Sequence, residues 1–423
     1  MILRFTIFIL LWCIPSVATS QTTDNEVRNT DLSQILSVDS AVDYALLNNP
    51  ALKALQEQLA SKRAEQGVWY GFDRPELIFA REGMNGNGFA EQRLEVKQTF
   101  DFPTSIAAQS RRISGLSNAL EAQFEAEKWE LIALVKNHYA QVLYTKKLVS
   151  LREEQVALAQ QIEHVALQRS QVGEVAKIEL LQAQLKSSEA AHALDQAQAQ
   201  YHDARYELFQ VMGIPIEEQH YSITFEDELS YEPIQVNQEE VLSAINRHHS
   251  LRAQNFLVAS AEASLSGKQA QLLPRISASY FAQDFGNGYD LNGFQIGLQI
   301  PLWFAVDQLP KIQMATADLR ASEYERERVR LDLKKQFEQN WHSFEQAKQQ
   351  IERYQTNVNE QSIELLELTR EAYRVGEAPL LSLLEAQRTY LSTQERYYNA
   401  LLNYSTRLVM LETILQTELN YAE

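Results

Sequence analysis

Residues that interrupt regular structure are scarce in this chain. Only 14 of its 423 residues are glycine and 10 are proline. Because these residue types mark turns and element ends, their scarcity predicts few turns and very long elements. Cysteine occurs once, at Cys13 within an N-terminal apolar segment. The rest of the chain therefore has no thiol, which excludes disulfide frameworks, zinc-thiolate sites and cysteine nucleophiles.

Long apolar runs and excess positive charge are also missing. No apolar run of about 18 residues follows the N-terminal segment, so the sequence offers no helix that could span a membrane. The 38 lysines and arginines are outnumbered by 56 acidic residues, giving a net charge of -18. This balance argues against nucleic acid as a partner and against simple adhesion to anionic lipid.

Signatures of catalysis and of metal binding are absent as well. The sequence has no nucleophile elbow, phosphate loop or paired-carboxylate motif, so we predict neither an enzyme nor a cofactor. The eight histidines include one adjacent pair, His248 and His249. Neighbouring positions on a helix face different directions, and we therefore predict no metal site there.

The N-terminus has the pattern of a secretory signal peptide. Arg4 precedes an apolar stretch at 5–14, Pro15 breaks it, and Ser20 ends a small-residue cleavage site. We predict a signal peptide at residues 1–20. Leucine and tryptophan stand just before Cys13, where a lipoprotein site needs a small residue, so lipidation is the less favoured alternative.

The remaining chain contains two copies of one plan. The stretch VGEVAKIELLQAQ at 172–184 returns as VGEAPLLSLLEAQ at 375–387, an offset of 203 residues. Earlier motifs return at smaller offsets: Pro75 matches Pro274 at 199, and Pro103 matches Pro301 at 198. The sequence therefore predicts a duplication of the whole half-chain, because the same motifs recur in the same order.

Each copy predicts a helix, a β-hairpin, a very long helix, a tip and a final helix. At about 1.5 Å per residue, each long helix would span about 100 Å. The expected domains are an N-terminal extension at 21–38, a first repeat at 39–212 (helix 39–71, hairpin 75–102, long helix 105–168, tip 169–176, helix 177–212), a linker at 213–238, a second repeat at 239–416 (first helix about 238–272, hairpin 274–302, long helix 304–372, tip 373–379, helix 380–415) and a tail at 417–423.

The hairpins alternate apolar and polar residues, as strands with one apolar face do. In RLEVKQTFDFP the odd-numbered positions include the charged residues Arg93, Glu95, Lys97 and Asp101. We predict that this charged set faces a wet interior and that the alternating apolar set faces lipid. The predicted lipid-facing residues are Leu94, Val96, Phe100, Phe102, Phe294, Ile296, Leu298 and Ile300. An ordinary half-buried strand between solvent and core gives the same alternation and is the alternative.

Four strands cannot close a barrel in lipid, where open sheet edges are not tolerated and barrels begin at about eight strands. The sequence therefore predicts an oligomer. A trimer would supply twelve strands, and threefold symmetry would also close the helices into a ring. The predicted fold class is mainly α with a small β part, in which long antiparallel helical hairpins form an α-barrel and four strands per protomer contribute to a trimeric transmembrane β-barrel.

The duplicated order of elements and the two V-G-E motifs resemble the TolC-like outer-membrane efflux proteins. The resemblance covers essentially all of the chain after the signal peptide, and the segment TFDFPTSIAAQSRR is most similar to the heavy-metal cation efflux branch. It implies a homotrimer in outer-membrane lipid, a helical domain in the periplasm, a periplasmic adaptor protein and an inner-membrane pump of the RND type.

The resemblance also implies roles for residues near the tips. The implied adaptor-docking residues are Arg169, Val172, Gly173, Arg374, Val375 and Gly376. The implied periplasmic gate uses Tyr373, with Glu179 as its acidic partner and Glu385 as an acidic ring. Ser382 and Ala378 replace a second acidic residue and an arginine of the family pattern, which predicts a looser gate. A surface pair of a coiled coil is the alternative for Tyr373 and Glu179.

Three functions remain open. The first is the exit duct for heavy-metal cations, and the second is the same duct serving drug efflux or type I protein secretion. The third is a periplasmic coiled-coil protein that forms no pore. The four segments of alternating apolar and polar residues favour a duct, since a coiled-coil scaffold does not require such strands.

Overall fold

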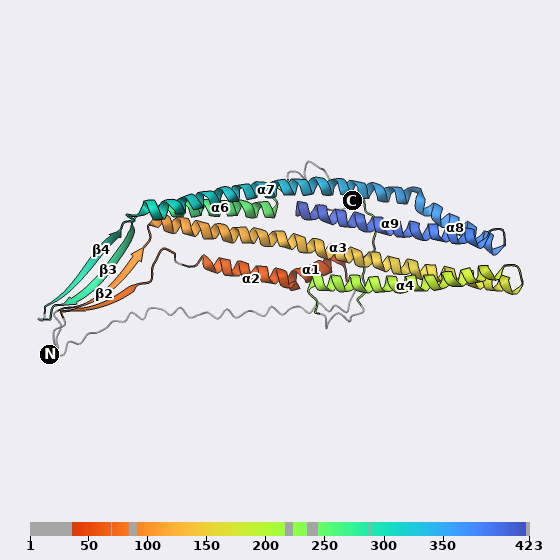
Figure 1. The fold of residues 1–423 in the computed structure, drawn as a ribbon, viewed down its shortest axis with the longest axis horizontal. Helices are drawn as coiled ribbons and strands as arrows, with labels where there is room; N and C mark the ends of the chain where they lie inside the picture. The colour runs from red at the N-terminus through yellow and green to blue at the C-terminus, as the bar shows by residue number, and fades with distance from the viewer. Residues whose placement is uncertain are drawn as a thin grey trace.

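The computed structural model describes residues 36–68, 70–83, 91–215, 223–234, 244–286 and 289–419. The predicted signal peptide with Cys13, most of the N-terminal extension, the tip of the first β-hairpin and the last four residues lie outside these ranges. The described chain is elongated: a sheet stands at one end, and two helical hairpin turns lie at the other (Figure 1).

The first repeat contains helices α1 (Val38–Asn48), α2 (Pro50–Glu65), α3 (Pro103–Gln171) and α4 (Lys177–Met212). The expected single helix at 39–71 is wrong, because the chain breaks between Asn48 and Pro50. Proline cannot continue a helix but suits its first position. Asn49 caps α2 by accepting hydrogen bonds from the amides of Ala51 and Leu52 at 2.9 and 3.2 Å.

The second repeat contains α6 (His249–Ala270), α7 (Phe304–Arg353), α8 (Asn359–Arg374) and α9 (Leu380–Leu415). The expected continuous helix at 304–372 is interrupted by a π-helical turn, η2, at Tyr354–Val358. Buried Val142 and Phe344 match at an offset of 202, whereas Val172 and Val375 match at 203. The second repeat thus holds one extra residue between these points, and a π turn absorbs one residue without ending a helix.

The sheet is antiparallel, with strand order β1-β2-β3-β4. Its strands are β1 (Glu76–Glu82), β2 (Glu91–Phe100), β3 (Arg275–Asp284) and β4 (Asp290–Gln299). The central pair joins the two repeats, because β2 of the first repeat pairs with β3 of the second. The predicted residues Phe102 and Ile300 lie beyond the strand ends. Pro103 and Pro301 end the extended segments, and Phe102 becomes the residue before α3.

The core is a series of hydrophobic clusters along the length of the helices. The described linker residues 223–234 contact two of these helices, α3 near its middle and α9 in its second half. Tyr139 of α3 donates a hydrogen bond to the Asp227 carboxylate at 2.6 Å, and Tyr404 of α9 donates to the carbonyl of Glu232 at 2.8 Å. The linker therefore fastens both repeats at the same level.

Among the helices that the structure describes, none combines the length and apolar character that a membrane crossing requires.

Candidate functional site

The two tips are duplicated turns that end α3 and α8. Gly173 and Gly376 adopt φ values of 80° and 83°, the left-handed conformation that glycine accepts without steric cost. In each turn the amide of the following glutamate returns to the helix, from Glu174 to the carbonyl of Arg169 at 2.9 Å and from Glu377 to that of Ala372 at 2.8 Å. This pattern is a glycine-ended helix stop, so the turn itself needs no functional explanation.

The valine before each glycine, in contrast, does need a functional explanation. Val172 is 71% exposed and Val375 is 63% exposed. Two apolar side chains thus project from duplicated turns at the end of the molecule, where no described residue covers them. Arg374 is exposed and paired with Glu371 at 2.9 Å. These positions are the ones that the resemblance assigns to adaptor docking.

Arg169 differs from the other predicted docking residues because it points toward the second tip. Its Nη1 donates to the carbonyl of Tyr373 at 3.4 Å, and its guanidinium lies 5.4 Å from the centre of the Tyr373 ring. Its Nε also pairs with Glu174 at 3.3 Å. Arg169 therefore joins the two tips within one protomer rather than presenting a free surface charge.

The predicted gate residues Tyr373 and Glu179 are in contact. Tyr373 is 2% exposed, and its hydroxyl donates a hydrogen bond to Glu179 Oε1 at 3.1 Å. Burial and the adjacent Glu179 carboxylate raise the pKa of Tyr373 to about 12. The phenol is thus neutral at ordinary pH and acts as a donor. The link connects the end of α8 to the start of α4.

A second polar pair lies deeper along the helices, and the sequence analysis did not single it out. Tyr390 of α9 donates to both carboxylate oxygens of Glu154 in α3, at 3.1 and 3.0 Å. The predicted ring residue Glu385 is exposed on α9. Nothing in the local sequence marks Tyr390, because its partner Glu154 lies on a helix that is remote along the chain, and the contact of Arg169 with Tyr373 is equally remote.

The sheet has one apolar and one polar face. Directly paired residues in an antiparallel sheet point to the same side. The pairs Val96–Leu77, Val96–Tyr280 and Tyr280–Phe294 therefore define one face. The exposed apolar residues of that face are Leu77, Phe79, Leu94, Val96, Tyr280, Phe294, Ile296 and Leu298. Phe100 is partly buried, because its ring meets Phe72 edge-on at 5.4 Å.

The opposite face carries charge. Arg93 pairs with Glu95 at 2.9 Å, and its guanidinium lies 4.1 Å from the centre of the Phe281 ring. The Phe281 ring covers the backbone of Gly293 on the adjacent strand, a position where any side chain would collide with it. Lys97 forms a further ion pair with Glu76 at 3.5 Å. Arg93, Glu95 and Lys97 thus share one side of the sheet, whereas Asp101, the fourth residue predicted to face a wet interior, lies beyond the end of β2.

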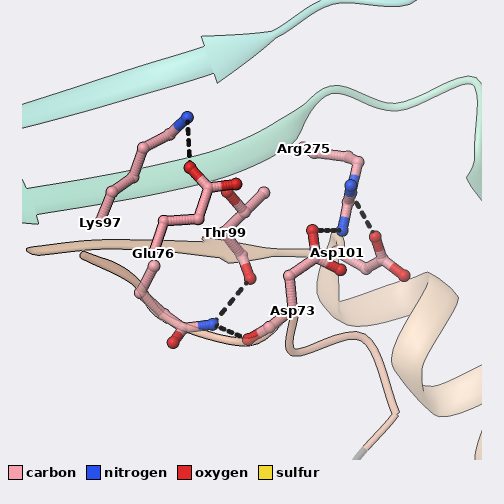
Figure 2. Close-up of polar contacts among 7 residues, drawn as sticks. Asp73, Glu76, Lys97, Thr99, Asp101 and Arg275 are labelled. Atoms are coloured by element: carbon pink, nitrogen blue, oxygen red, sulfur yellow. Dashed lines mark hydrogen bonds and ion pairs between the residues drawn. The ribbon is translucent and has the colours of Figure 1, made fainter. Parts of the chain in front are cut away.

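Arg275 of β3 pairs with two carboxylates of the first repeat, one just before β1 and one just after β2. Figure 2 shows its guanidinium between two carboxylates, with Nε donating to Asp101 Oδ1 at 2.6 Å and Nη2 to Asp73 Oδ2 at 2.8 Å. At the duplicated position the first repeat has Glu76, which carries the opposite charge. This clamp joins β3 to the strand-to-helix joint of the first repeat.

His248 serves as a helix cap. Its Nδ1 accepts a hydrogen bond from the amide of Ser250 at 3.1 Å, at the position where Asn49 caps α2 in the first repeat. Burial lowers the pKa of His248 to about 4, which keeps this acceptor unprotonated. Within the ranges that the structure describes, no three histidine, cysteine, aspartate or glutamate side chains are grouped to hold a metal ion.

Comparisons with known proteins support the resemblance. Residues 241–416 match the model of the family described as outer membrane efflux protein. The outer membrane efflux protein BepC of Brucella suis is 23% identical over 264 residues, which make up 60% of this chain and 56% of BepC. The chain thus matches little more than half the length of this relative.

Solved structures match over most of the chain. The outer-membrane protein VceC from Vibrio cholerae is 16% identical, with a TM-score of 0.76 over 90% of this chain and 97% of VceC. The outer-membrane channel OprN is 18% identical, with a TM-score of 0.75 over 89% of both chains. The fold is that of these outer-membrane channels. CusC has the same fold at 16% identity and a TM-score of 0.75, over 89% of this chain and 91% of CusC.

This fold confirms the predicted fold class as mainly helical with a small β part, which comprises four strands among the residues that the structure describes. The described features fit this fold. The two-faced sheet lies at one end of the molecule and the helix turns that carry the exposed valines lie at the other, with the helices between them (Figure 1).

Proposed function

We propose that this chain is the outer-membrane channel of a tripartite efflux system, a passive exit duct without enzymatic activity. The observation that carries the proposal is the sheet, with an exposed apolar face, a charged face and outer strands β1 and β4. An isolated sheet of this kind would expose both its apolar face and its edges to solvent. Lipid would cover the apolar face, and copies of the chain would pair with the edges.

The proposed assembly is a homotrimer with twelve strands. Strands β2, β3 and β4 each have 10 residues, which matches the 9 to 11 residues of a tilted transmembrane strand. The row containing Leu94, Val96, Phe294, Ile296 and Leu298 would face outer-membrane lipid. The Arg93, Glu95 and Lys97 side would line the lumen, and the helices would continue the duct into the periplasm.

The tips are the proposed contact with a periplasmic adaptor protein, which would connect the duct to an inner-membrane pump of the RND type. Exposed Val172 and Val375 supply the apolar contact, and Gly173, Arg374 and Gly376 shape the surrounding surface. The link between Tyr373 and Glu179, with Arg169 packed against it, is the proposed latch of the periplasmic gate. Three copies of Glu385 would place negative charge at the same entrance and favour cations.

The proposed substrate class is heavy-metal cations, by resemblance of the strand-to-helix segment to that branch. Drug efflux and type I protein secretion are served by the same architecture and form the alternative. Sensitivity of a deletion strain to metal salts and to drugs, measured side by side, separates the two. Restoration of metal tolerance alone by the intact gene is expected, and restoration of drug tolerance alone would contradict the metal assignment.

Cysteine labelling tests the lipid assignment. In a Cys13→Ser background, we compare an environment-sensitive fluorophore at Val96→Cys with the same probe at Lys97→Cys, its neighbour on the opposite face. Nitroxide lipids should quench the probe at position 96 strongly and the probe at 97 weakly. Equal quenching, or quenching only at position 97, would contradict the proposed barrel.

A further inference from the structure

A cluster of exposed apolar side chains surrounds the point where β4 passes into α7. Trp303 is 81% exposed and Val306 is 78% exposed, and Leu302 and Phe304 are exposed beside them. We call these four residues the junction cluster. The backbone there is well tied, because the amides of Val306 and Asp307 both donate to the carbonyl of Trp303 at 3.1 Å. The cluster therefore presents large side chains from a fixed backbone.

The corresponding joint of the first repeat has no such exposed apolar cluster. At an offset of 198, Trp303 corresponds to Ser105, which is small and buried against neighbouring helices. The first repeat passes from strand to helix without any large exposed side chain in its first turn. The bulk of the junction cluster is thus particular to the second repeat, and tryptophan is the residue type most enriched at energetically dominant positions of protein interfaces.

An apolar groove lies at the same end of the sheet but beside the opposite edge. This junction groove has a volume of about 310 Å³ and is lined by Val68, Tyr70, Phe72, Ile106 and Ile113, with polar side chains at its rim. Val68, Tyr70 and Phe72 precede β1, and Ile106 and Ile113 lie in α3, whereas the junction cluster follows β4. Within one chain α2 and α7 lie on opposite sides of α3 (Figure 1), and no residue of the junction cluster lines the groove.

Ring closure brings the two features together. Strand β1 begins, and strand β4 ends, at the helical end of the sheet, and the two run antiparallel to one another. In a closed ring of identical copies, β4 of one copy lies beside β1 of the next. The segment after β4 then lies against the segment before β1 of the neighbouring copy.

We infer that the junction cluster of each copy inserts into the junction groove of the next, with Trp303 as the anchor. This contact rests on the proposed trimer and adds a residue-level device to it, namely an apolar lock at the level where the sheet meets the helices. An unpartnered sheet edge can pair in more than one register, and a side-chain lock outside the strands selects one of them. The occupant of the groove is therefore a second copy of this chain rather than lipid.

Disulfide trapping tests this contact. In the Cys13→Ser background we combine Trp303→Cys with Val68→Cys and oxidise the membrane-extracted protein, whose mass is measured separately by light scattering. Disulfides form only when the two Cα atoms come within about 7 Å. We expect dimer and trimer bands on a non-reducing gel. The matched control pairs Trp303→Cys with Leu47→Cys, an exposed apolar position that precedes α2 and should give neither band.

A second variant measures the contribution of the lock. Removal of an interface tryptophan of this kind weakens one contact by about 30-fold, so Trp303→Ala, which removes the anchor from all three contacts, should raise the trimer dissociation constant by at least that factor. The control Tyr324→Ala removes another exposed aromatic side chain of α7 and should change it less than twofold.

The outcomes separate the two proposals. A trimer without cross-linking of positions 303 and 68 overturns the lock and leaves the proposed duct intact, and quenching by brominated lipids in the parent trimer that is lost in Trp303→Ala would show that lipid covers the junction cluster. A monomer in every detergent and lipid tested overturns the duct and the lock together.

Discussion

Removal of one hydroxyl group, by Tyr373→Phe, should loosen the proposed periplasmic gate. The hydroxyl lies 3.1 Å from the Glu179 carboxylate, while the ring beneath the Arg169 guanidinium stays in place in phenylalanine. A hydrogen bond to a charged group contributes about 1.5 to 3 kcal/mol, and the partial exposure of Glu179 reduces this to about 1 kcal/mol. Three symmetric links would then stabilise the closed state by about 3 kcal/mol.

This energy corresponds to a change of roughly 100-fold in the ratio of closed to open channels. Planar bilayer recordings should therefore show a much higher open probability for Tyr373→Phe than for the parent protein. The exposed Tyr324 of α7 supplies the control, since Tyr324→Phe removes a hydroxyl away from the tips. Equal open probability for the parent protein and both variants would refute the latch.

The same latch predicts a dependence on alkaline pH. The pKa of Tyr373 is raised to about 12 where its link to Glu179 is formed, whereas a solvated tyrosine has its ordinary value near 10. A group whose pKa is raised in one state stabilises that state below its ordinary pKa and ceases to do so above the raised value. Open probability should therefore rise between pH 10 and about 12, and Tyr373→Phe should lack this rise.

Three other variants test separate parts of the structure. Val172→Asp combined with Val375→Asp should leave a folded trimer but abolish adaptor cross-linking and efflux, whereas unchanged efflux would exclude the tips as the docking surface. His248→Ala should lower stability by about 1 kcal/mol in chemical denaturation, and His248→Asn should restore the cap. Because the pKa of His248 falls to about 4 in the folded chain, stability should decline as pH falls below 6.5, by up to roughly 3 kcal/mol near pH 4, and this decline should be smaller in His248→Asn. Arg275→Gln removes two partly exposed ion pairs and should cost about 1 kcal/mol in unfolding, with Arg275→Lys intermediate; no loss would show that the clamp is dispensable.

Local patterns account for most of the architecture. Pro103 and Pro301 mark the joints between strands and long helices, and Gly173 and Gly376 mark the tips, because each residue type restricts the backbone in a way visible in the sequence. Alternation also placed Leu94 and Val96 on one face of β2 and the charged residues on the other.

The differences between the predicted and the observed elements have identifiable causes. The break at Asn49 combines a cap with a proline, and the periodic pattern on both sides concealed it. The π turn at Tyr354–Val358 follows from one extra residue, which is visible only when the offsets between buried positions of the two repeats are compared. The contacts of Arg169 with Tyr373 and of Tyr390 with Glu154 arise from packing of segments that are remote in sequence, a relation that local patterns do not contain.

The central claim is that three copies of this chain close into one pore. The most direct measurement combines the mass of the membrane-extracted protein with its conductance in planar bilayers. The proposed duct predicts a mass three times that of the protomer and ion conduction by that species, with a preference for cations. A stable monomer or dimer that conducts no ions would contradict it.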